Sequence, residues 1–122
     1  MLIGVRALLA LALLSAVTGA ASAQGNDEMA EYYGNTLISR DGGYVSHFYY
    51  KADHTFSGRV PAYMFEFQGT WQQMPDGTIC RVFDPPLPRV KNPDCGPLLV
   101  HHLGDNENEP NGDTEKLVPG IQ

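Results

Sequence analysis

Phe67-Gln68-Gly69-Thr70-Trp71 and, after the turn Pro75-Asp76-Gly77, Thr78-Ile79-Cys80-Arg81-Val82-Phe83 are the segments that decide the fold. The turn favours chain reversal, because proline presets φ and glycine takes the left-handed position that returns the chain. The second segment is rich in β-branched and aromatic residues, which favour strands. The sequence therefore predicts a β-hairpin that contains the only tryptophan and one of the two cysteines.

Aromatic residues alternate along the first strand of this hairpin, which is predicted to span 62–71. Because successive side chains of a strand point to opposite faces, one face carries Tyr63, Phe65, Phe67 and Trp71. A pattern with one apolar face indicates a sheet with one buried side. These residues form either part of the core or the lining of a ligand cavity, as in barrel carriers. A chain this short has little interior to spare, which favours the core.

Further strands are predicted on both sides of the hairpin. They span 35–40, 44–51, 55–60, 98–103 and 114–118. The segment 44–51 carries bulk on both faces, which indicates a central strand. His54 is expected at a positive φ between two of these strands, since histidine tolerates that conformation better than most residues.

A short helix is predicted at 27–33, because Met29, Tyr32 and Tyr33 share one helical face and acidic residues precede them. The expected fold class is therefore all-β and mainly antiparallel, with a short N-terminal helix and one disulfide. Its six or seven short strands form a small curled sheet that is either a sandwich or barrel-like.

The N-terminus has the features of a secretory signal peptide over residues 1–23. Arg6 gives a basic start, residues 7–17 are apolar, and Ala21-Ser22-Ala23 fits a cleavage site. A transmembrane anchor is the alternative, but this apolar run is too short to span a bilayer. We therefore expect a periplasmic or secreted protein with no membrane span after cleavage, and one small β domain at 24–122.

Two cysteines in an exported chain predict one disulfide, because the compartment is oxidising. Cys80 and Cys95 would form it. Two reactive thiols are the alternative, but the C-x-x-C spacing of redox sites is absent. The cleaved chain would have seven basic and fourteen acidic residues. This acidic balance without a basic cluster argues against nucleic acid and anionic membranes as partners.

Residues 84–97 form a proline-rich segment with prolines at 85, 86, 88, 93 and 97. Because proline cannot continue a helix or a central strand, the segment is predicted to be a stiff loop. Its charged residues Asp84, Arg89, Lys91 and Asp94 are expected to face solvent. Arg89 and Lys91 are the predicted contacts with a partner.

The histidines suggest a metal site only weakly. His101 and His102 are adjacent on the strand predicted at 98–103, so their side chains would point to opposite faces. Ordinary surface or sheet histidines are the alternative that the spacing favours. No serine lies in a nucleophile turn, and Glu66 is interpreted as a residue of the solvent face. No catalytic, cofactor-binding or metal-binding residue is therefore predicted, and no cofactor.

Several short motifs together resemble a group of small exported proteins of Gram-negative bacteria that are catalogued as domains of unknown function, the DUF995-like proteins among them. The motifs are Tyr-Gly-Asn-Thr-Leu at 33–37, Ala-Asp-His-Thr at 52–55, Gly-Thr-Trp at 69–71, Asp-Gly-Thr-Ile-Cys at 76–80, Asn-Pro-Asp-Cys at 92–95 and Gly-Asp at 104–105. The resemblance covers most of residues 33–105. It implies an exported β domain with a Cys80–Cys95 bridge, and it implies no activity.

We expect a non-enzymatic exported binding or interaction module of the cell envelope. Its partner would be an envelope or secreted protein, or a small ligand. Inhibition of a secreted hydrolase is the alternative, since a stiff loop pinned by a disulfide is ordered before it binds. A hydrolase is the third and weakest hypothesis, because no positioned nucleophile accompanies the acids.

Overall fold

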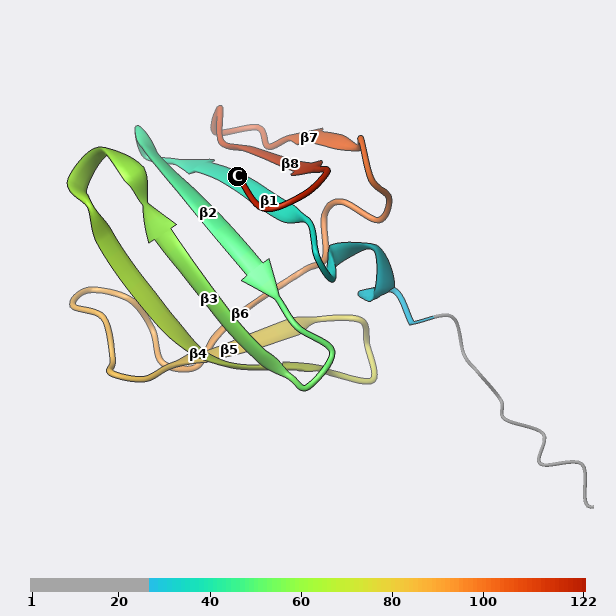
Figure 1. Cartoon of the computed structure of the whole chain (residues 1–122), viewed down its shortest axis with the longest axis horizontal. Helices are drawn as coiled ribbons and strands as arrows, with labels where there is room; N and C mark the ends of the chain where they lie inside the picture. Colours follow the sequence, from blue (N-terminus) through green and yellow to red (C-terminus); the bar gives the residue numbers. More distant parts are fainter. Residues whose placement is uncertain (1–26) are drawn as a thin grey trace, which may run out of the picture.

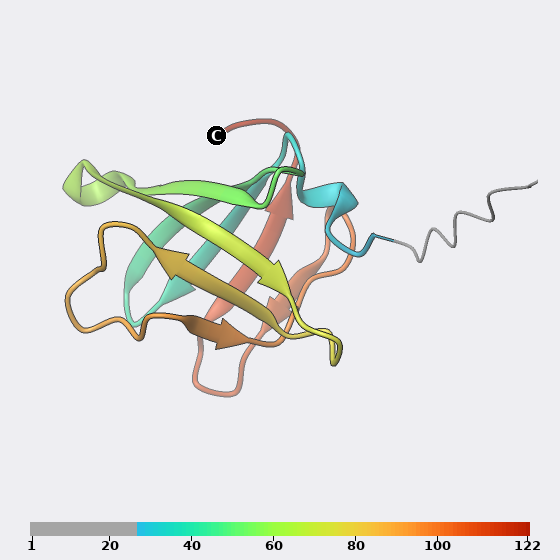
Figure 2. The ribbon, with the colours of Figure 1, turned by 90° about the horizontal axis from the view of Figure 1, so that it is seen from below.

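The structure is a computed structural model that describes residues 27–122, in which eight strands form one antiparallel sheet (Figure 1). The strands are β1 (Thr36–Asp41), β2 (Tyr44–Tyr50), β3 (Thr55–Val60), β4 (Phe65–Gln73), β5 (Ile79–Phe83), β6 (Asp94–Gly96), β7 (Asn106–Asn108) and β8 (Thr114–Val118). Their order in the sheet is β6-β5-β4-β3-β2-β1-β8-β7. The sheet curls into a half-barrel with β6 and β7 at its two ends (Figure 2). The predicted signal peptide lies outside the described residues.

The predicted hairpin is confirmed as β4 and β5. Trp71 and Arg81 are opposite each other in the register of this pair. The turn between the strands closes with a main-chain hydrogen bond of 2.7 Å from the Met74 N–H to the Thr78 oxygen. Gly77 has a φ of 88°, the left-handed conformation that the turn chemistry predicted. His54 also has the expected positive φ, at 66°.

The concave face of the half-barrel holds the core. The buried apolar residues are Met29, Tyr32, Leu37, Tyr50, Phe56, Phe67, Trp71, Ile79, Phe83, Val100 and Leu117. Trp71 is only 4% exposed, and the cavity that remains near Tyr50 and Arg81 measures about 30 Å³. Such a volume holds about two water molecules. The buried aromatic residues are therefore core and do not line a metabolite-sized cavity.

Two glycines allow neighbouring strands of the sheet to approach closely. A Cβ atom on Gly58 would collide with the Phe67 ring, and one on Gly69 would collide with the Val82 main-chain oxygen. Glycine is therefore required at both positions for the close approach of β3, β4 and β5.

The predicted helix at 27–33 is not present. The structure has a single 3-10 turn there, η1 (Ala30–Tyr32), and Tyr33 is already extended. The Asp27 carboxylate accepts the Met29 N–H at 3.0 Å, which fixes a turn at the start of the segment. A run this short cannot sustain an α-helix without tertiary support, and burial of Met29 and Tyr32 is satisfied by one turn.

The prediction of a strand at 98–103 is wrong, and two short strands lie on either side of this segment. Residues 97–103 form an irregular segment, whereas β6 and β7 lie on either side of it. Val100 is buried, and its carbonyl oxygen accepts a hydrogen bond of 2.6 Å from the Tyr32 hydroxyl. Val100 and Leu98 therefore pack against the core, and the segment does not pair along a sheet edge.

The aromatic strand begins later than predicted. The turn η2 (Pro61–Tyr63) precedes it, and Met64 is left-handed with a φ of 51°. This reversal removes Tyr63 from the strand, and its side chain is 65% exposed. Phe65 shares the face of Phe67, but it is the first residue of β4 and is 45% exposed. Only Phe67 and Trp71 of the predicted aromatic face are buried. Among residues 27–122, no helix has the length and apolarity needed to cross a membrane.

Candidate binding groove

The outer face of β3 and β4 presents a row of polar side chains. Phe56 and Phe67 point into the core, so the residues that alternate with them point outward. The outward residues form three cross-strand pairs, which are Thr55 with Thr70, Ser57 with Gln68, and Arg59 with Glu66. This row is the floor of a groove.

The proline-rich loop, residues 84–93, forms a wall of this groove. The Asp84 N–H donates a hydrogen bond of 2.9 Å to the Gln68 carbonyl oxygen, which places the start of the loop against β4. A hollow of about 370 Å³ lies between Pro85 and Leu87 on one side and Tyr49, Arg59 and Gln68 on the other.

A second hollow continues the first across the same strands. It measures about 330 Å³ and shares Ser57 and Gln68 with the first. Lys51 and Thr70 line its far part. Each hollow has the size of a site for a small molecule or a few residues of a peptide. The two hollows and the loop 84–93 are called the groove surface below.

Arg59 lies at one end of the groove. Its Nε–H donates a hydrogen bond of 3.0 Å to the Tyr49 hydroxyl, which in turn donates one of 2.7 Å to the main-chain oxygen of Gln122. In the part of the chain that the structure describes, Arg59 has no carboxylate within ion-pair distance. Its charge is therefore held in place by a neutral hydroxyl.

Arg89 and Lys91 are exposed on the loop, as predicted. Arg89 has a φ of 63°, and the Asn92 side chain fixes the base of the loop. The Asn92 carboxamide accepts the Phe83 N–H at 2.9 Å and donates to the Phe83 oxygen at 3.1 Å. Both views show the loop and the β3–β4 connection at the end of the half-barrel away from η1 (Figures 1 and 2). The partner contact of Arg89 and Lys91 stays a prediction.

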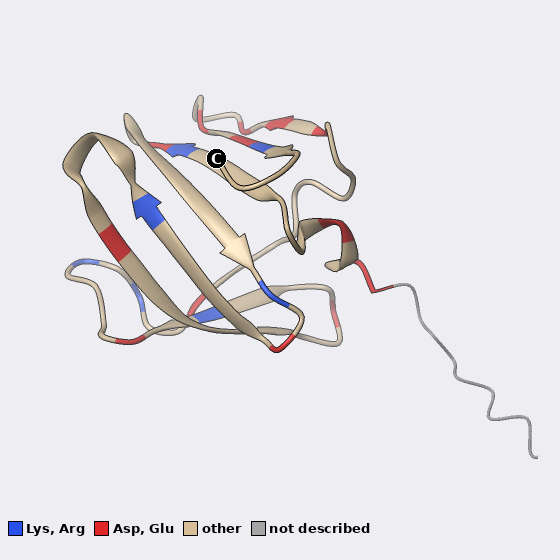
Figure 3. Cartoon of the chain, viewed as in Figure 1, with Lys and Arg blue, Asp and Glu red and all other residues tan. Residues whose placement is uncertain are grey.

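Charge is distributed unevenly over the described residues. The groove surface carries four basic side chains, Lys51, Arg59, Arg89 and Lys91, and two acidic ones, Glu66 and Asp84. The rest of residues 27–122 has three basic and twelve acidic side chains. Figure 3 shows blue segments on the loop and β3, and red segments gathered around β7 and β8. The groove surface is therefore the one basic region of an acidic protein in this part of the chain.

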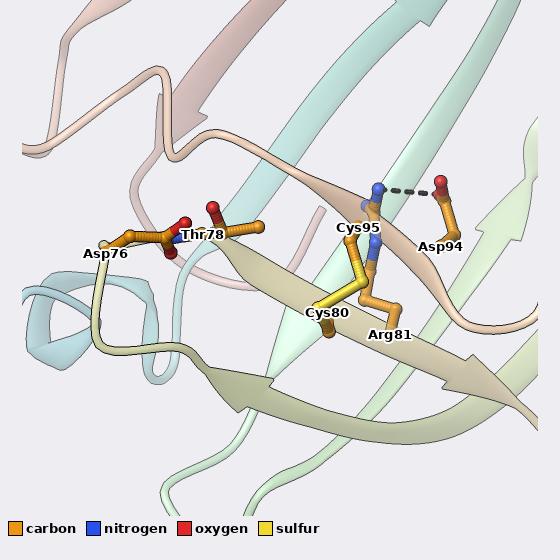
Figure 4. Close-up of a disulfide and its surroundings, with 6 residues drawn as sticks. All are labelled: Asp76, Thr78, Cys80, Arg81, Asp94 and Cys95. Carbon is orange, nitrogen blue, oxygen red and sulfur yellow. Dashed lines mark hydrogen bonds and ion pairs between the residues drawn. A yellow bond between two sulfur atoms is a disulfide. The ribbon is translucent and has the colours of Figure 1, made fainter.

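The sequence predicted that Asp94 would face solvent, but its side chain is only partly exposed and is already paired. It is half-buried and forms an ion pair with Arg81, with an Nη2–Oδ2 distance of 2.9 Å (Figure 4). The guanidinium also donates to the Tyr50 hydroxyl at 3.3 Å and lies 5.0 Å from the centre of the Phe48 ring. The Arg81 Nε–H is buried without a hydrogen-bond partner. This cluster stabilises the inner face where β5 meets β6.

The sequence contains a signal for this inner cluster. Ile79 and Phe83 are buried, so period-two alternation places Arg81 on the same inner face. Glu115 of β8 also lines the cavity beside Arg81. Burial raises the pKa of Glu115, and the nearby Arg81 charge partly opposes this shift. The cavity is too small for a ligand, so these charges belong to the packing of the half-barrel.

The two adjacent histidines are not on a strand, so the argument from opposite strand faces does not apply to them. Both His101 and His102 are exposed. The His102 Nδ1 lies 2.6 Å from a Glu31 carboxylate oxygen, and this contact raises the pKa of His102. Across residues 27–122, no three histidine, cysteine, aspartate or glutamate side chains are grouped closely enough to hold a metal ion.

Comparison of the chain with protein-family models, curated proteins and solved structures finds no match. The groove surface and its charge are therefore the features of the molecule that bear on its function.

Proposed function

We propose that this protein is an exported, non-enzymatic binding module of the cell envelope, and that the groove surface contacts its partner. The observation that carries the proposal is the hollow of about 370 Å³ that joins the proline-rich loop to the outer face of β3 and β4. The loop thus adds a wall to a site with polar donors, apolar contacts and basic charge. A partner with an acidic or polar surface fits it.

The loop is held in shape before any partner arrives. Its start is bonded to Gln68, and its end is bonded to Phe83 through Asn92. The disulfide between Cys80 and Cys95 closes just beyond it. A loop with few conformations loses little entropy on binding, so more of the contact energy appears as affinity.

The same geometry supports a second function, the inhibition of a secreted hydrolase. An anchored loop with exposed Arg89, Val90 and Lys91 at its tip has the form that a protease or glycosidase cleft accepts. The two functions differ in the partner. Inhibition requires that the loop enter an active site, which a substrate competes for.

The proposal is tested by replacing residues 86–91 with a Gly/Ser linker. The variant and the parent are used to capture partners from an envelope extract, and both are tested against secreted hydrolases. A Gly/Ser replacement of residues 109–112, in the turn between β7 and β8, is the matched control. We expect the loop variant to lose the captured partner and the control to keep it. Equal capture by both variants overturns the proposal.

A further inference from the structure

We propose that the groove takes an extended acidic peptide segment of a partner protein, with one of its carboxylates bound by Arg59. This inference rests on the proposed function and specifies its partner. The floor of the groove crosses β3 and β4, and its two hollows share Ser57 and Gln68, so they form one continuous path. An extended segment is the shape that such a shallow path across strands accommodates.

The anchor for a carboxylate is the guanidinium of Arg59. Its Nε–H is already bonded to the Tyr49 hydroxyl, which fixes the plane of the group beside the groove. No carboxylate lies within ion-pair distance of Arg59 among residues 27–122. A guanidinium held by a neutral partner keeps its charge and several N–H donors for a ligand. An acidic side chain supplies the complementary group.

Each hollow holds one cation and one carboxylate. Arg59 and Glu66 line the first hollow, and Lys51 and Asp84 line the second. Between them, Ser57, Gln68 and Thr70 offer neutral donors and acceptors, and Pro85 and Leu87 offer an apolar wall. A segment in which acidic and polar residues alternate would present its carboxylates on one face, toward the cations.

Glu66 opposes this binding and provides a test of its electrostatic basis. It is the cross-strand partner of Arg59 and lines the same hollow. Its negative charge lowers the attraction that an incoming carboxylate experiences. Removal of this charge should therefore strengthen binding, whereas removal of the Arg59 charge should weaken it. If the two residues mattered only for folding, their substitutions would not change peptide affinity in opposite directions.

The experiment uses an NMR titration of the whole exported chain with acetyl-(Thr-Glu)4-amide, and with acetyl-(Thr-Gln)4-amide as the neutral probe. We expect the acidic peptide to shift the Arg59 Nε–H signal and the amide signals of Ser57 and Gln68. Arg59→Gln should weaken the acidic peptide about fivefold, and Glu66→Gln should strengthen it. Arg40→Gln, on the exposed end of β1, is the matched control and should change nothing.

Two results overturn the inference. One is an equal response to both peptides, and the other is an absence of shifts at the groove. Either result leaves the proposed function intact if loop-dependent capture of a partner persists. If the parent captures no loop-dependent partner but the acidic peptide still binds, the proposed function fails and this inference stands. The groove would then bind acidic segments without the loop. The two failures are therefore distinguishable.

Discussion

The His54 ring lies on the Trp71 indole, with ring centres 4.3 Å apart and planes 11° from parallel. Trp71 also donates its Nε1–H to the Lys51 carbonyl oxygen at 3.0 Å and its main-chain N–H to the His54 oxygen at 2.9 Å. The tryptophan therefore holds the turn between β2 and β3 from the neighbouring strand. It links the core to the end of the groove where Lys51 lies.

Replacement of Trp71 by alanine should lower the free energy of unfolding by about 3–5 kcal/mol, because it empties a buried aromatic site. Chemical denaturation measures this change. Trp71→Phe keeps apolar surface but loses the indole hydrogen bond. Its free energy of unfolding should therefore lie between those of the parent and Trp71→Ala. A Trp71→Ala variant as stable as the parent contradicts a structural role.

The disulfide joins cross-strand partners of β5 and β6 and closes the loop that carries Arg89 and Lys91. A Cys80→Ser, Cys95→Ser double variant should lose about 2–4 kcal/mol of unfolding free energy, mainly because its unfolded chain is freer. Denaturation of the parent with and without reductant gives an independent measure. Two titratable thiols in protein purified without reductant would contradict the bond.

The contact between His102 and Glu31 should depend on pH. The hydrogen bond to Glu31 raises the pKa of His102 in the folded state. The contact therefore stabilises the fold fully at a pH below the ordinary pKa of histidine, and this stabilisation is lost as the pH rises through the raised pKa of His102. NMR titration of His102 in the parent and in Glu31→Gln measures the shift. We expect the midpoint to fall in the variant. Identical midpoints would show that the two side chains do not interact in solution.

Glu115 should destabilise the fold when it is ionised. Burial raises its pKa, so folding becomes less favourable as pH rises through the interval above its usual value. Glu115→Gln should therefore stabilise the protein more at pH 7 than at pH 4, where the carboxyl is protonated in the unfolded chain as well. Unfolding free energies at both pH values provide the check. A variant that is equally destabilised at both would contradict this account.

The hairpin of β4 and β5 could be predicted because its signals are local. Alternation of apolar residues and the chemistry of Asp76-Gly77 both lie within a few positions of the strands that they define. β6 and β7 could not be predicted, because each has only three residues and depends on a partner distant in sequence. Cys95 of β6 is opposite Cys80 of β5, and Glu107 of β7 is opposite Glu115 of β8.

The candidate site divides in the same way. The exposure of Arg89 and Lys91 follows from the composition of the loop, which local sequence reveals. The place of Arg59 in the groove could not be predicted from local sequence. It depends on the curl of the sheet and on the hydrogen bond that brings Asp84 against Gln68 of β4. Neither relation leaves a periodic pattern in the sequence, so the groove becomes visible only in three dimensions.

The central claim is that a partner binds on the groove surface, and site-specific photocrosslinking tests it most directly. A photoreactive phenylalanine derivative is placed at Val90, on the loop and 39% exposed, or at Glu107, exposed on β7 on the acidic part of the protein. Both variants are expressed in cells, and the crosslinked products are compared after illumination. We predict a partner adduct from position 90 and none from position 107. An adduct from position 107 with none from position 90 would contradict the account.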